Sequence, residues 1–390
     1  MSVCYISSKE NRFYAALEQG FGFVAPVTEA NRLPAVKLAA SQQLERVERR
    51  DKTGSRTFAG LPDGMRKRTR FEVTTYMTSW SPAQASPGYG PLFQAALGGS
   101  PMVFGGGVLA SISGLQIGFS SAHSLEAGQA ISCGGEIRFV TAIPDGQSII
   151  MNAPFTADQQ PGWPVDRTVT YRPATELPSA SIYDYWSPET AVQRILAGSA
   201  IDELKLTING DFHEFRFRGL AADMLDSASF AAGQGALSAF PTEPEQLEFD
   251  YSVIPGNLGQ AWLGNTPDQF FTLTEAEILL DNALELRARE FGVDTPQCIV
   301  GGERSVTANF NLFERPDTAT KSLYQAARQR SPLSVMFQLG QQPSQLCGVY
   351  LKSVIPEVPE FIDGDTRLEW QFRNCRATGT IDDEVFIAFG

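Results

Sequence analysis

The feature that most constrains the fold of this chain is a weak internal repeat. The motif Leu-Phe-Gln-Ala-Ala at residues 92–96 returns as Leu-Tyr-Gln-Ala-Ala at residues 323–327, and each copy is followed four residues later by Ser-Pro. Upstream, residues 68–76 and 304–312 each begin with arginine and continue as a run typical of a strand. The two spacings differ by five residues, which fall in the Pro-, Ser- and Gly-rich segment 79–91, where a longer loop costs little free energy.

The repeat and the length of the chain together predict two related domains. A chain of 390 residues exceeds what one core usually fills. Its 35 glycines, 24 prolines and 26 phenylalanines favour a turn-rich β protein. We therefore predict a mainly β fold with two curled β-sheets or half-barrels, at residues 1–180 and 181–390. Each has a short flanking helix, at residues 92–97 and 323–328, in which Leu92 and Phe93 correspond to Leu323 and Tyr324.

Local patterns place several strands. Apolar residues alternate with polar ones over residues 71–77, and an Asn-Gly turn at Asn209 separates two alternating runs, which predicts a hairpin. Glycine and Asp-Gly turns punctuate residues 115–155, so a small β insert is expected there. In the second unit, strands are expected at residues 334–339, 348–354, 368–372 and 384–389.

Three further segments show mixed patterns. Residues 9–20 end at a glycine and predict a short helix, and residues 183–197 predict a connecting helix. Residues 274–291 have a spacing that permits a helix, and alignment with the first copy also permits a strand followed by an arm.

Charge and cysteine content exclude some classes of protein. The net charge of −13 argues against a protein that grips nucleic acid, because such proteins carry a basic surface. The only dense basic cluster spans residues 66–70, and we interpret it as a subunit interface. Five cysteines without Cys-x-x-Cys spacing favour reduced thiols. No secretory signal and no membrane-spanning segment are predicted.

No catalytic or metal site is predicted. The chain has only two histidines, His123 and His213, and no set of His or Cys at metal-ligand spacing. The glycines at 105–107 lack the Lys-Ser or Lys-Thr that completes a phosphate loop. The acidic run 382–384 would support a glycosidase only if its carboxylates faced each other across a cleft with Trp163 or Trp262. We expect no enzyme activity and no cofactor.

Three segments resemble a known family. Residues 31–38 (Asn-Arg-Leu-Pro-Ala-Val-Lys-Leu), residues 48–57 (Glu-Arg-Arg-Asp-Lys-Thr-Gly-Ser-Arg-Thr) and the hairpin 209–213 are similar to the tail tube proteins of long-tailed bacteriophages, of the duplicated, two-domain type. The resemblance extends over most of the chain as a similar pattern of residue types, and it includes no catalytic motif. The insert at 115–155 departs from a minimal tube domain.

The resemblance implies a structural virion subunit that is assembled in the host cytoplasm. Three two-domain chains would form a ring with six similar positions, neighbouring sheets would pair edge to edge, and rings would stack through arms at residues 44–62, 79–91 and 294–304. The implied lumen is acidic and lets DNA pass without specific binding, and the implied partners are tape-measure and tail-terminator proteins. The interface candidates are Arg49, Arg50, Arg66, Arg68, Arg70 and Arg304.

Two alternatives remain open at this level. One is a distal-tail or baseplate protein, or a tube component of an injection system. The other is a β-rich protein that binds or acts on carbohydrate. The repeat favours the structural interpretation, because a single active site gains little from duplication.

Overall fold

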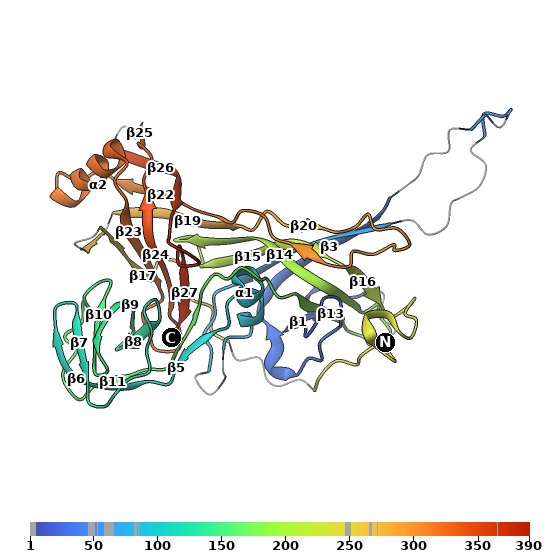
Figure 1. Cartoon of the computed structure of the whole chain (residues 1–390), viewed down its shortest axis with the longest axis horizontal. Helices are drawn as coiled ribbons and strands as arrows, with labels where there is room; N and C mark the ends of the chain where they lie inside the picture. Colours follow the sequence, from blue (N-terminus) through green and yellow to red (C-terminus); the bar gives the residue numbers. More distant parts are fainter. Residues whose placement is uncertain are drawn as a thin grey trace.

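The computed structural model describes residues 5–45, 51–52, 54–57, 66–81, 84, 86–245, 251–264, 267–270, 272–364 and 366–390. Within these residues the chain is mainly strand, with α-helices at α1 (Gly90–Leu97) and α2 (Thr318–Gln329) (Figure 1). The prediction of a mainly β fold is confirmed. Short 3₁₀ turns lie at η1 (Ser8–Glu10), η2 (Glu29–Asn31) and η3 (Gln234–Ala236).

One large curled sheet organises the described part of the chain and contains 19 strands. In chain order they are β1 (Asn11–Leu17), β2 (Arg32–Leu33), β3 (Ala35–Leu44), β4 (Lys67–Tyr76), β5 (Met102–Phe104), β12 (Thr168–Tyr171), β13 (Ala180–Trp186), β14 (Arg194–Ile208), β15 (Glu214–Ala221), β16 (Asp223–Asp226), β17 (Gly259–Leu263), β18 (Asp268–Gln269), β19 (Leu273–Asp281), β22 (Ser305–Phe313), β23 (Leu333–Leu339), β24 (Cys347–Ile355), β25 (Glu360–Asp363), β26 (Leu368–Ala377) and β27 (Phe386–Phe389).

The spine of this sheet is the antiparallel run β3–β4–β15–β14–β19–β22–β26–β25. Side chains alternate between its two faces. One face is apolar and buried, with Val73 on β4, Phe217 on β15 and Leu204 on β14 in register. The other face is polar and at least partly open, and we call it the open face. The alternation in the sequence therefore determines which face forms the core.

The two halves of the chain follow the same order of elements. In the first, β3 is followed by β4 and then by α1; in the second, β19 is followed by β22 and then by α2. The leucines that the repeat aligns, Leu92 and Leu323, are both buried. Phe93 is fully buried among the rings of Phe215, Phe217 and Phe389, whereas its counterpart Tyr324 packs on Trp370 near the surface.

Both halves share the spine, and pairing crosses the predicted division at 180/181. This boundary falls at the first residue of β13, which pairs with β1 over seven residues. Strand β15, from the second range, pairs with β4 over eight residues. One hydrogen-bonded sheet runs through both ranges, so strand pairing does not separate them. The division into two domains at 180/181 remains a prediction.

The predicted β insert is present and wider than 115–155. A separate six-stranded sheet has the spatial order β11–β6–β7–β10–β9–β8. Its strands are β6 (Gly107–Ser113), β7 (Gln116–Phe119), β8 (Ala130–Cys133), β9 (Glu136–Asp145), β10 (Ser148–Met151) and β11 (Pro164–Val165). It has its own apolar core and docks on the main sheet through Phe139, which stacks on Tyr350. Figure 1 shows it at one end of the molecule.

Two helix predictions are wrong. Residues 9–20 form η1 and β1, and residues 183–197 form most of β13 and the start of β14. In β1 four consecutive residues, from Phe13 to Ala16, are buried because both faces of the strand are covered. Such a run lacks period-two alternation, so its pattern does not distinguish a strand from a helix.

The strand-plus-arm alternative for residues 274–291 is confirmed. This segment contains β19 and the start of an arm that carries the small hairpin β20 (Glu285–Leu286) with β21 (Ile299–Val300). The hairpin at Asn209 joins β14 to β15, and Asn209 has a φ of 65°, in the left-handed region. Strands β23, β24, β26 and β27 lie close to their predicted ranges.

Candidate functional site

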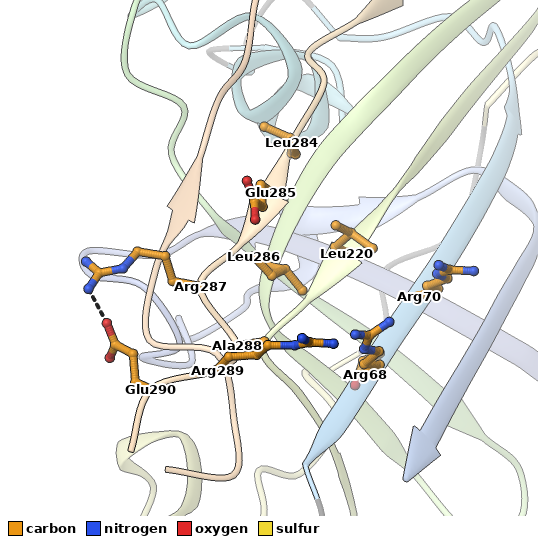
Figure 2. Close-up of a pocket in the computed structure, with 11 residues that line it drawn as sticks. Arg68, Arg70, Leu220, Leu284, Glu285, Leu286, Arg287, Ala288, Arg289 and Glu290 are labelled. Atoms are coloured by element: carbon orange, nitrogen blue, oxygen red, sulfur yellow. Dashed lines mark hydrogen bonds and ion pairs between the residues drawn. The ribbon is translucent and has the colours of Figure 1, made fainter. Parts of the chain in front are cut away.

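The segment of residues 282–304, between β19 and β22, is called the second arm. A groove lies where this arm crosses the open face of β4 and β15 (Figure 2). Its volume is about 620 Å³. We call it the arginine groove, and its lining residues are Arg68, Thr69, Arg70, Leu220, Leu284, Glu285, Leu286, Arg287, Ala288, Arg289 and Glu290. All four of its arginines are exposed and its leucines are partly exposed, so the groove is open to a partner.

Strand β4 supplies one wall. Arg68 and Arg70 alternate with the buried Thr69 and Phe71, which places both arginines on the open face. Arg68 is in register with Gln43 and Arg70 with Ser41 on the neighbouring strand β3, so no carboxylate lies opposite either of them. Within the described part of the chain neither arginine forms an ion pair. Two neighbouring unpaired guanidinium groups form a site for carboxylates, which arginine binds through paired hydrogen bonds.

The second arm supplies the other wall. Arg287 is paired with Glu290 on the same arm. Arg289, with a side chain 74% exposed, lies 3.9 Å from a carboxylate oxygen of Glu45, and Figure 2 shows it extending toward the strand of Arg68. Both contacts are solvent-exposed ion pairs, which contribute little to stability and exchange easily.

Backbone contacts hold the arm in place. The amide of Lys67 donates to the carbonyl of Asp294 at 2.9 Å, which joins the start of β4 to the second arm. At the start of the arm, the amide of Leu284 donates to Asp202 Oδ1 at 2.7 Å. Leu220, Leu284 and Leu286 line the groove between its arginines. Hydrogen bonds therefore hold both walls of the groove in place, and the groove combines positive charge with apolar surface.

The rest of the open face carries both signs of charge. Along one cross-strand row, Glu72, Arg218, Glu203 and Asp281 lie in register on β4, β15, β14 and β19. Elsewhere Lys205 forms a cross-strand ion pair with Glu277 at 2.5 Å. The net charge of −13 is thus not concentrated on this face as an acidic lining.

The structure brings together only part of the predicted interface set. Arg68 and Arg70 line the groove, and Arg66 precedes them, half-buried, with its carbonyl accepting from the amide of Glu45. Arg304 is engaged inside the molecule, paired with Asp382 at 2.7 Å and with Glu384. Arg49 and Arg50 lie outside the described residues.

The groove contains residues that the sequence analysis missed. Arg287 and Arg289 were not among the predicted interface residues, although the alignment of the two repeats places an arm after β19. The order of residues along the second arm does not indicate that this arm crosses β4, a strand of the other repeat. The alternation of charged and apolar residues at 284–290 was the only available signal.

The two histidines are not arranged as catalytic groups. His213 is 1% exposed, its Nε2 lies 3.0 Å from the carbonyl of Leu258, and burial lowers its pKa below 6.5. His123 lies 3.3 Å from the carbonyl of Ser148 and accepts a hydrogen bond from the amide of Leu125. In the described residues no group of three or more His, Cys, Asp or Glu side chains is placed to hold a metal ion.

The acidic run 382–384 lies apart from the tryptophans. Asp382 and Asp383 line a second cleft of about 700 Å³, but Arg304 and Lys352 already pair with them. Trp262 is buried against Arg138. The pairing of carboxylates with a tryptophan across a cleft, which a carbohydrate-active protein would need, is therefore not found among these residues.

No family model matches the sequence, and no curated protein matches it either. Neither α1 nor α2, the two α-helices in the described part of the chain, has the length and apolar character that crossing a membrane requires. The four described cysteines, Cys133, Cys298, Cys347 and Cys375, are free thiols. Any functional conclusion therefore rests on the sheet and the groove.

Proposed function

We propose that this chain is a structural virion subunit that associates with copies of itself into rings, and that the rings stack as a phage-like tail tube. The observation that carries the proposal is the long spine of the sheet with a free strand at each end. In the described residues β3 pairs only with β4, and β25 pairs only with β26. Free edges present unpaired backbone groups that favour pairing with another chain.

The open face supports a second part of the proposal, a water-filled conduit. A face that carries polar groups from β3 to β26 is suited to solvent and not to a core. DNA affinity is dominated by contacts between phosphates and cations. Because carboxylates are interspersed among the cations of this face, it offers no continuous basic track, and DNA would pass without tight binding. A ring-shaped association of three chains is the geometry that we propose for this conduit.

The test is negative-stain electron microscopy of the purified chain over a concentration series. We expect rings or stacked hollow tubes with three-fold or pseudo-six-fold end views. Ile362 is 40% exposed on the edge strand β25, and Ile362→Lys should block assembly, since a charge on an edge opposes strand pairing.

The matched control is Ile381→Lys, at a residue 81% exposed and outside the strands, which should assemble normally. Monodisperse monomers at every concentration would contradict self-assembly of this chain. Equal assembly by both variants would show that β25 is not at the contact.

A further inference from the structure

We infer that the arginine groove of one copy receives the segment of residues 357–363 from the next copy, an inference that rests on the proposed self-assembly. We call residues 357–363 the acidic strip. In Figure 1, β25, which carries most of the acidic strip, lies at one end of the long axis, and β20, at the groove, lies well away from it. Their complementary surfaces therefore cannot meet within one copy. A head-to-tail contact between copies satisfies both, and such a contact can close into a ring.

The acidic strip is matched to the groove in chemistry. It contains the carboxylates of Glu357, Glu360 and Asp363 and no cation. Its apolar side chains are unusually exposed, with Val358 at 47%, Phe361 at 55% and Ile362 at 40%. Acids interspersed with exposed apolar residues complement a groove that combines four arginines with three leucines.

The strip is available for docking. Glu360 forms no ion pair within the described residues, and Glu357 has only a solvent-exposed pair with Arg330 at 3.4 Å. The ring of Phe361 stacks on Trp370 with 5.4 Å between centroids, which leaves the rest of its surface to solvent. Phe361 lies on the opposite face of β25 from Glu360, whereas Ile362 lies on the same face as Glu360 and supplies an exposed apolar contact beside the carboxylate.

The strand register places the charges on the same face. Glu360 pairs with Gln371, which belongs to the open face, and Arg68 and Arg70 belong to the open face of β4. Glu360 of one copy and the two groove arginines of the next are therefore displayed on corresponding faces of the sheet, as a contact inside the groove requires.

A second copy is the occupant that the structure favours over other anionic partners. A nucleic acid would use the arginines and would leave Leu220, Leu284 and Leu286 without apolar contacts. An acidic apolar peptide uses both kinds of surface. The chain itself displays such a peptide on a strand that has a free edge.

A charge-swap experiment tests the contact. The groove variant carries Arg68→Glu with Arg70→Glu, and the strip variant carries Glu357→Lys with Glu360→Lys. Sedimentation velocity over a concentration series should show association weakened roughly tenfold or more for each variant alone. An equimolar mixture should recover pairwise association of unlike copies, because a reversed groove then meets a reversed strip and a native groove meets a native strip. A ring of three keeps one like-charged contact, so the recovered species should be open and not closed rings. The recovery should fade as salt screens the charges.

The control variant is Arg172→Glu with Arg376→Glu, which changes net charge equally at exposed sites away from the groove and should associate like the native chain. Unchanged melting temperatures establish that each variant is folded. If the native chain assembles and the groove variant does too, or if the mixture shows no recovery, this docking is wrong while the tube proposal stands. A native chain that never associates overturns both.

Discussion

Arg138 shows how a single residue joins the insert to the main sheet. It is fully buried on β9, pairs with Glu136 at 2.6 Å, and donates to Gln338 at 2.8 Å and Gln260 at 2.9 Å on β23 and β17. Its remaining N–H groups donate to the carbonyls of residues 137 and 154. Burial lowers its pKa to about 10, so it remains charged at neutral pH. A buried charge is stable only when it is paired and hydrogen-bonded in this way.

We predict that Arg138→Met lowers the free energy of unfolding by about 3–5 kcal/mol, because it leaves Glu136 buried without its cation. Urea unfolding followed by circular dichroism measures the effect. Arg218→Met, at an exposed arginine without an ion pair among the described residues, is the control and should change stability by less than about 0.5 kcal/mol. Similar decreases in the free energy of unfolding for the two variants would show that the buried network of Arg138 does not contribute to stability.

His213 predicts how stability depends on pH. Its pKa in the folded chain is lowered by burial, so the unfolded chain binds a proton at a higher pH than the folded chain does. Stability contributed by neutral His213 is therefore complete above pH 6.5 and is lost as pH falls from that value to the lowered folded pKa. His213→Gln keeps a donor for the carbonyl of Leu258 and should remove this part of the pH dependence. Urea midpoints at several pH values between 5 and 8 measure the difference, and identical profiles would contradict it.

At the scale of elements, the fit between β14, β15 and β4 depends on a glycine. Gly219 lies between Ile201 and Phe71 in the sheet, and a Cβ atom there would be 1.9 Å from the carbonyl oxygen of Ala200. The register of β14 and β15 also shifts next to this position, between Ile201 and Glu203. The backbones therefore approach more closely here than a side chain permits.

Gly219→Ala is expected to destabilise the chain by about 1–3 kcal/mol, because the strands must separate to admit a methyl group. Gly146→Ala is the matched control, since a Cβ atom at Gly146 meets nothing within 4 Å and its φ is not positive. Thermal unfolding of the two variants distinguishes them. A control that loses as much stability as the Gly219 variant would exclude the close approach as the cause.

At the scale of the whole molecule, the continuous sheet makes the two halves interdependent. Pairing of β1 with β13 and of β4 with β15 joins residues on either side of 180/181. The two ranges that the sequence repeat relates thus share one hydrogen-bonded spine. Each half alone would expose long unpaired edges, which favour aggregation.

Separately expressed chains of residues 1–180 and 181–390 should therefore be insoluble or unfolded, whereas co-expression should yield a soluble complex. Size-exclusion chromatography with circular dichroism checks both outcomes. Cooperative melting of either piece alone would show instead that the ranges are independent domains.

The sequence by itself determined the mainly β fold, most strands of the second half, both α-helices and the two arginines of the groove on β4. Alternation and the repeat carry this information, because side-chain period and turn residues act locally. Tertiary structure alone decided that residues 11–17 form a strand, since only the covering of both faces explains four consecutive buried residues. It also decided that the second arm brings Arg287 and Arg289 to the groove. Contacts between segments more than two hundred residues apart depend on how the sheet curls, and no local pattern encodes that.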